Sequence, residues 1–180
     1  MEEPGRQSEN HQSNGIPDMT IRPAERADAS GFVRLVKELA IFEKLEPPDE
    51  AAQARLIEDV FGEIPRIEVW LAVEGTHQEP VGYMILLETY SSFLALPTLY
   101  LEDVFVLPER RRHGIGGALL RKAVELARER GCGRVEWAAL DWNTNARAIY
   151  EQKLGVRRMR EWVLYRMGQG EMDAFLAEPK

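Results

Sequence analysis

The apolar residues near the start of the chain recur at helical spacing, first after Asp28 and again after Asp49. Aspartate is a common helix N-cap, and two prolines, Pro47 and Pro48, separate the two patterns. The apolar positions of the first pattern are Phe32, Leu35, Val36, Leu39 and Phe42, and those of the second are Leu56, Ile57, Val60 and Phe61. The spacing therefore predicts two consecutive helices, of which the second ends at Gly62.

From residue 67 onward the pattern changes to short apolar runs, which indicate strands. Strands are predicted at residues 20–22, 67–73, 81–90, 99–106, 134–140 and 160–167, with a hairpin connection at 75–80 and a loop at 91–97. Further helices are predicted at residues 115–130, 144–154 and 171–176. This order predicts an α/β fold, with one mixed domain over residues 19–180 and a disordered polar tail over residues 1–18.

The charge and composition limit the classes of partner. The 180 residues carry a formal net charge of −7, which argues against nucleic acid. Residues 1–107 hold 20 acids and 8 bases, whereas residues 108–180 hold 10 acids and 15 bases. This split indicates that the first part binds a cationic ligand and the second an anionic one. The alternative is a surface charge that is unevenly spread by chance.

The sequence contains no apparent membrane-spanning segment and only one cysteine. No apolar run reaches transmembrane length, and the N-terminus lacks the basic-then-apolar pattern of a signal peptide. We therefore expect no membrane partner. Cys132 is the one cysteine, so no intramolecular disulfide can form, and we expect a structural role for it and a cytoplasmic location.

The most informative segment is Arg111-Arg112-His113-Gly114-Ile115-Gly116, which lies between a predicted strand and a predicted helix. Glycines let the backbone approach a ligand, and the free N–H groups of a helix N-terminus attract anions. The segment lacks the Lys-Ser/Thr of a nucleoside-triphosphate loop, and Leu119 stands where a dinucleotide fingerprint needs glycine. The pattern favours an anionic cofactor of another kind, with a plain turn as the alternative.

Arg-x-x-Gly-x-Gly after a strand resembles the pyrophosphate loop of the GNAT superfamily of acetyl-coenzyme A-dependent N-acetyltransferases, and the predicted element order is that of this fold. Five further segments look like its spermidine/spermine (diamine) acetyltransferase branch. These segments are Lys37–Ala40 with Phe42-Glu43, Thr89-Tyr90, Tyr100–Val106, Trp142-Asn143 and Ala148–Gly155. The resemblance covers roughly residues 19–170 and implies a single mixed, mainly antiparallel twisted sheet flanked by helices.

The resemblance also implies acetyl-CoA as co-substrate, no metal, and a homodimer whose interface includes the C-terminal strand. It places the following residues at the cofactor: Val104, Phe105, Val106, Arg111, Arg112, His113, Gly114, Ile115, Gly116, Gly117, Asn143 and Ala146. In the family, a bulged strand frees the N–H of Phe105 or Val106 for the acetyl carbonyl. Asn143 either fixes the pantetheine arm or caps the following helix.

Acetylation requires that an ammonium lose a proton and that the departing thiolate gain one. Glu102 lies within an apolar strand, where a carboxylate is costly unless it is used, and the resemblance gives it the role of base through a water. The alternative is a strand edge or a salt bridge, and in a regular strand Glu102 and Asp103 point to opposite faces. The resemblance makes Tyr150 the acid, with plain packing as its alternative.

The substrate side is less well defined. Phe42, Glu43, Glu102 and Asp103 are the expected substrate-binding residues, but Phe42 stands where the diamine branch has Tyr, and Phe93 where it often has Trp. We therefore predict an acetyltransferase acting on a small cationic amine, either a polyamine, a diamine or a lysine-like amino acid. An amino-acid, antibiotic or protein acetyltransferase and a non-catalytic acyl-coenzyme A-binding regulator are the alternatives.

Overall fold

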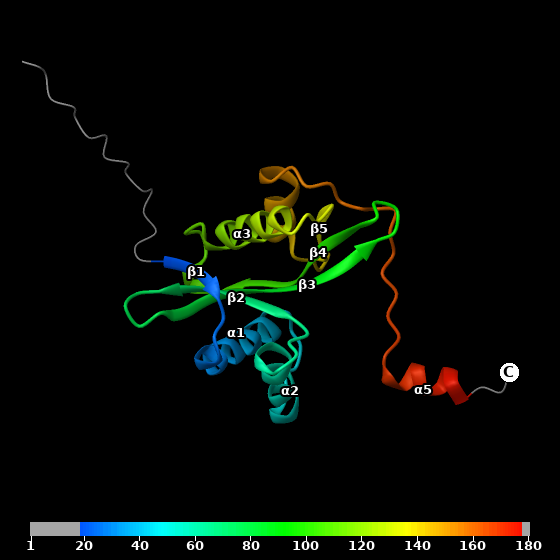
Figure 1. The fold of residues 1–180 in the computed structure, drawn as a ribbon, viewed down its shortest axis with the longest axis horizontal. Coiled ribbons are helices and arrows are strands. Elements are labelled where there is room, and N and C mark those ends of the chain that lie inside the picture. Colours follow the sequence, from blue (N-terminus) through cyan, green and yellow to red (C-terminus); the bar gives the residue numbers. More distant parts are fainter. Residues whose placement is uncertain (1–18, 178–180) are drawn as a thin grey trace, which may run out of the picture. The chain divides into compact units, whose positions relative to one another are not determined.

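The structure, a computed structural model, describes residues 19–177 (Figure 1). It divides into two compact units, one ending at Ala138 and the other beginning at Ala139, and each is described by itself. The tail predicted at residues 1–18 lies outside the described residues. Within residues 19–177, no helix is long and apolar enough to cross a membrane.

The first unit is built on a five-stranded sheet in the order β1-β2-β3-β4-β5. The strands are β1 (Met19–Pro23), β2 (Glu68–Glu74), β3 (Glu79–Ser91), β4 (Leu96–Val106) and β5 (Arg134–Trp137). The pairs from β1 to β4 are antiparallel, and β4 and β5 are parallel. The mixed, mainly antiparallel sheet of the prediction is confirmed, and the sheet lies between helical layers.

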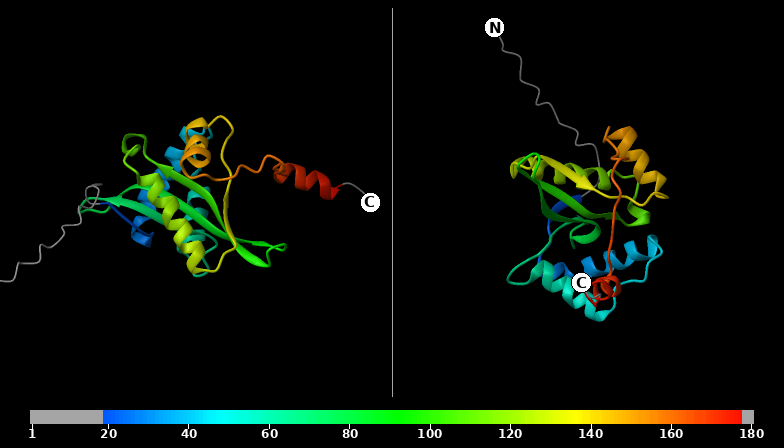
Figure 2. Two further views of the ribbon diagram at one scale, coloured as in Figure 1. Left: turned by 90° about the horizontal axis from the view of Figure 1, so that it is seen from above. Right: turned by 90° about the vertical axis from the view of Figure 1, so that its right-hand side faces the viewer.

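Helix α3 (Ile115–Glu129) covers one face of this sheet, whereas α1 (Ala29–Phe42) and α2 (Glu50–Phe61) lie on the other (Figures 1 and 2). Phe32 and Leu35 of α1 are fully buried, as are Ile115 and Leu119 of α3. The sheet side chains between the helices complete the core, so the apolar spacing that predicted each helix marks the face that it buries. Asp49 caps α2 as predicted, and its side chain accepts from the Ala52 backbone N at 2.7 Å.

Strand β4 contains a bulge that shapes the site. Its register places Asp103 opposite Ile85 but Leu101 opposite Leu86, so Glu102 is an extra residue in β4. Strand β5 pairs with β4 only over Thr98–Leu101 and therefore stops where the bulge begins. The strand predicted at residues 134–140 is correspondingly shorter and ends at Trp137.

The second unit contains α4 (Thr144–Ala148), a π-helical turn (Ile149–Lys153) and α5 (Gln169–Ala177). The helix predicted at residues 144–154 is thus an α-helix that changes to a π-turn, and the terminal helix is confirmed. The strand predicted at residues 160–167 is wrong, since the segment has no regular structure and Trp162 and Tyr165 are 72% and 87% exposed. A strand exists only when it pairs with another, and in the described part of the chain no strand pairs with this segment.

Candidate functional site

The loop before α3 presents unpaired backbone donors. Gly114 is the N-cap and has a φ of 85°, a left-handed conformation that favours glycine. No side chain caps the helix, and the Ala118 N–H donates to the Gly114 carbonyl at 3.0 Å. The N–H groups of Ile115, Gly116 and Gly117 therefore precede the first intrahelical hydrogen bond, and the positive end of the helix dipole lies with them.

The space over this first turn is open. A Cβ added at Gly116 would meet only a Val106 methyl group at 3.8 Å, and one at Gly117 would meet nothing within 4 Å. Packing within the chain therefore does not require glycine at either position. Arg112 and His113 beside them are exposed, and Arg112 adds positive charge. These residues fit an anionic group such as a diphosphate.

Arg111 is bound to the protein itself. Its Nε donates to the Val106 carbonyl at 2.9 Å, and its guanidinium lies 4.5 Å from the centre of the Phe42 ring and 5.4 Å from that of Phe105. Burial lowers the pKa of Arg111. The side chain thus ties the glycine loop to the end of α1, a contact that sequence spacing gave no means of finding.

The end of β4 has a free side. The Leu107 N–H donates to the Val81 carbonyl at 3.0 Å, so by alternation the backbone of Phe105 also pairs toward β3. The backbone groups of Val104 and Val106 point the other way, where no strand of the described residues pairs beyond Leu101. Of the two N–H groups expected for the acetyl carbonyl, this register favours that of Val106.

Asp103 lies on the α1 side of the sheet, and the charges of two further acids, Glu43 and Glu102, act on it. Tyr83 contacts Phe32 of α1, and alternation puts Ile85, and with it Asp103, on the same face. The Tyr83 hydroxyl donates to Asp103 Oδ2 at 3.1 Å. Burial raises the pKa of Asp103 to about 6, and the charges of Glu102 and Glu43 add to this, whereas the Tyr83 hydrogen bond opposes it.

These acids lack a basic partner. Among residues 19–177, no ion pair involves Glu43, Glu102 or Asp103. Burial also raises the pKa of Glu43, and Glu102 is the exposed member of the three. The charge of Glu102 raises the pKa of both Asp103 and Tyr100. The arrangement fits a cationic ligand.

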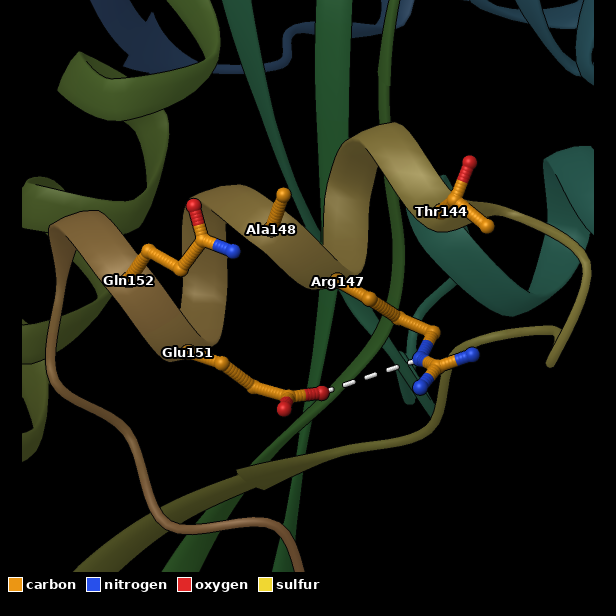
Figure 3. Close-up of a pocket in the computed structure, with 5 residues that line it drawn as sticks. All are labelled: Thr144, Arg147, Ala148, Glu151 and Gln152. Atoms are coloured by element: carbon orange, nitrogen blue, oxygen red, sulfur yellow. Dashed lines mark ion pairs between the residues drawn. The ribbon is translucent and has the colours of Figure 1, made fainter.

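The second unit holds Asn143, Ala146 and Tyr150. The Asn143 side chain accepts from the Ala146 backbone N at 3.2 Å, so it caps α4. Tyr150 lies in the π-turn, and burial raises its pKa. Figure 3 shows Arg147 and Glu151 pointing toward one another across a hollow of about 160 Å³ on this helix, with their charged groups 3.6 Å apart.

Sequence reasoning missed Tyr83. A tyrosine within an apolar strand normally indicates core packing, and Tyr83 is indeed fully buried. A buried hydroxyl needs a hydrogen-bond partner, however, and this requirement is the signal that was available. Within the described residues, no group of three or more His, Cys, Asp or Glu side chains is placed to hold a metal ion.

The site thus combines an uncapped glycine turn, a bulged strand and an acidic face, by which we mean Glu43, Glu102 and Asp103. Comparison with known proteins identifies the family. The model of the acetyltransferase (GNAT) family matches residues 34–156, and the chain belongs to this family. The resemblance inferred from the glycine loop is thereby confirmed.

Curated relatives have related activities in their names. The chain is 36% identical over 166 residues to the thialysine N-epsilon-acetyltransferase of Bos taurus, covering 87% of this chain and 96% of that protein. It is 42% identical over 93 residues to the L-ornithine N5-acetyltransferase NATA1 of Arabidopsis thaliana, covering 52% and 40%. It is 30% identical over 159 residues to the human spermidine/spermine N(1)-acetyltransferase-like protein 1, covering 84% and 23%.

Proposed function

We propose that this acetyltransferase moves an acetyl group from acetyl-CoA to the side-chain amine of a small cationic substrate, with both bound at once. The observation that carries the proposal is the acidic face on the α1 side, where Glu43, Glu102 and Asp103 have no basic partner among the described residues. An ammonium group would neutralise these charges. A neutral amide or hydroxyl substrate would leave them unpaired.

The glycine turn is the proposed binding place of the cofactor's diphosphate. The N–H groups of Ile115, Gly116 and Gly117 would donate to it, with Arg112 and His113 beside them. Acetyl-CoA supplies an acetyl thioester. The Val106 N–H points away from β3 and would donate a hydrogen bond to the carbonyl oxygen of this thioester. The remaining expected cofactor contacts are part of the same proposal, and they lie at Val104, Phe105, Gly114, Asn143 and Ala146. The positive charge of Arg111 would add to the attraction of the cofactor's phosphates.

Two residues are proposed to move protons. Glu102 is exposed at the bulge and would accept the ammonium proton through a water, after which the free amine attacks the carbonyl carbon. Tyr150 would donate its hydroxyl proton to the sulfur as the carbon–sulfur bond breaks, and the surplus proton of the attacking nitrogen would then return to the Tyr150 oxygen as the amide forms. A tyrosine hydroxyl is protonated at neutral pH and therefore has a proton to give.

A basic amino acid is the substrate class that we favour over a polyamine. Relatives named for acting on thialysine and ornithine share 36% and 42% identity with this chain over the matched residues. Both compounds carry a primary amine at the end of a short chain, which suits an acidic face of three carboxylates. Phe42, in contact with Arg111, would line the entrance together with Glu43.

Two further expectations belong to this proposal. We propose a homodimer, in which the exposed apolar residues Trp162, Val163, Leu164 and Tyr165 become covered. We also propose a cytoplasmic location, in keeping with the single Cys132.

A substrate panel tests the proposal. Release of coenzyme A is measured with acetyl-CoA and thialysine, lysine, ornithine, spermidine, spermine, an aminoglycoside and a lysine peptide. We expect the highest kcat/KM with thialysine, lysine or ornithine. A preference for spermidine would assign a polyamine substrate, and tight acetyl-CoA binding without turnover of any amine would support the acyl-coenzyme A-binding regulator instead.

A further inference from the structure

The hydroxyl of Tyr83 is deeply buried next to the acidic face and donates a hydrogen bond to Asp103. Tyr83 is fully buried, and its ring lies edge-on to Phe32 of α1, with 5.4 Å between ring centres and an 81° angle between planes. The Phe105 ring of β4 lies 6.2 Å away on a second side. The ring is therefore held by two elements, and its hydroxyl has a fixed position.

The strand register brings this hydroxyl to Asp103. Tyr83 is paired with Phe105, and Asp103 with Ile85, so Tyr83 and Asp103 are diagonal neighbours on one face of the β3–β4 pair. The hydroxyl donates to Oδ2 at 3.1 Å. This bond uses one acceptor position on Oδ2 of Asp103. Since a carboxylate has several acceptor positions on its two oxygens, Oδ1 can accept a further hydrogen bond.

We infer that Tyr83 is a positioning residue of the amine site: its hydroxyl fixes the Asp103 carboxylate on the α1 side of the sheet and leaves Oδ1 to accept from the substrate ammonium. This inference rests on the proposed function. Without the donor, the half-buried carboxylate would be free to rotate, and only the like charges of Glu43 and Glu102 would act on it.

The titratable groups that face Asp103 come from three elements. They are Tyr83 on β3, Glu102 on its own strand and Glu43 at the end of α1. Tyr83 is the one that favours the ionised carboxylate, since its hydrogen bond lowers the pKa of Asp103, whereas burial and the two acids raise it. Removing the hydroxyl must therefore move the ionisation of Asp103 to higher pH.

The variant Tyr83→Phe removes the hydroxyl and keeps the ring. With thialysine as the amine, we expect KM for the amine to rise about tenfold, in line with the loss of one hydrogen bond to a charged group. The KM for acetyl-CoA should stay at the parent value. The acid limb of the profile of kcat/KM against pH should move to higher pH. An unchanged amine KM together with an unchanged acid limb would overturn the inference.

Phe32→Leu is the matched control, because it disturbs the packing of the Tyr83 ring but keeps the hydroxyl. We expect a lower melting temperature and an acid limb at the parent position. If Phe32→Leu moved the acid limb as far as Tyr83→Phe, then packing and not the hydrogen bond would control Asp103, and the inference would be wrong.

An Asp103→Asn background tests whether the two residues act together. Adding Tyr83→Phe to it should cause no further rise in the amine KM, since the residue that Tyr83 positions no longer carries a charge. A second tenfold rise would show that Tyr83 acts independently of Asp103.

The inference and the proposed function fail in different ways. Carboxyl NMR titration of Asp103 needs no substrate, and its pKa should be higher in Tyr83→Phe than in the parent protein. If the parent protein acetylates no amine, the proposed function fails. If it acetylates thialysine and Tyr83→Phe has the parent KM, pH profile and Asp103 titration, only the inference fails.

Discussion

Asp103 is expected to cost the protein stability at neutral pH. Burial, with the charges of Glu102 and Glu43, raises its pKa from 3.8 to about 6. Since tenfold in an equilibrium constant is about 1.4 kcal/mol, the ionised carboxylate costs the folded state about 3 kcal/mol. The folded state binds this proton more tightly than the unfolded chain, so stability falls as pH rises from about 4 to about 6 and is then constant with respect to this group.

Asp103→Asn removes this ionisation and keeps an oxygen that can accept from the Tyr83 hydroxyl. We expect the variant to be more stable than the parent at pH 8 by about 1 to 3 kcal/mol, the lower figure allowing for burial of the amide NH₂ group. At pH 4 the folded-state carboxyl is protonated and the unfolded-state carboxyl is only about half ionised, so the gain should fall below about 1 kcal/mol. The same variant should use thialysine poorly, because the ammonium loses a charged partner.

Urea unfolding at both pH values measures the effect through the midpoint concentration. Glu102→Gln is the matched control: it neutralises an exposed carboxylate on the same strand and should change stability by less than about 0.5 kcal/mol. The reasoning is refuted if Asp103→Asn is less stable than the parent at pH 8, or if its gain is the same at pH 4 and pH 8.

Three further variants test the proposed roles. Gly116→Leu should fold with equal or slightly higher stability, because the added Cβ meets only a methyl group at 3.8 Å. Calorimetry should nevertheless show loss of acetyl-CoA binding, and unchanged affinity would make the loop an ordinary turn. Glu102→Gln should lower kcat/KM at neutral pH and recover at high pH, where free amine is abundant, and a profile parallel to the parent's would exclude the base role. Tyr150→Phe should lower turnover at least about 100-fold with unchanged binding and melting temperature, and full turnover would leave Tyr150 as a packing residue.

Local features of the sequence predicted much of the fold. The cap at Asp49 and Gly114 at the start of α3 act within a few residues of themselves, so local spacing sufficed to predict the helix after each of them. Asp28 stands at the N-cap position of α1, but its side chain binds Arg22 and the Glu25 N–H and makes no cap hydrogen bond to this helix. The strand predicted at residues 160–167 failed for the opposite reason. Its apolar residues suit a strand, but a strand also needs a partner, and spacing does not supply one.

The site depends on contacts between distant segments. The bond from Tyr83 to Asp103 follows from the register of β3 on β4, and the bulge leaves Glu102 as the extra residue of β4. The contact of Arg111 with Phe42 joins the loop to the other face of the sheet. Glu102 and Asp103 stood out in the sequence as acids within an apolar strand, but their different burial depends on this three-dimensional pairing.

Transfer of labelled acetyl groups tests the central claim most directly. The protein is incubated with acetyl-CoA labelled in the acetyl group and with thialysine, and the products are separated and identified by mass spectrometry. The account predicts labelled N-acetylthialysine, modified at the side-chain amine, in amounts that grow with time and exceed the amount of protein. Label that remains in acetyl-CoA or appears only as free acetate, with thialysine and with every other amine of the panel, would contradict it.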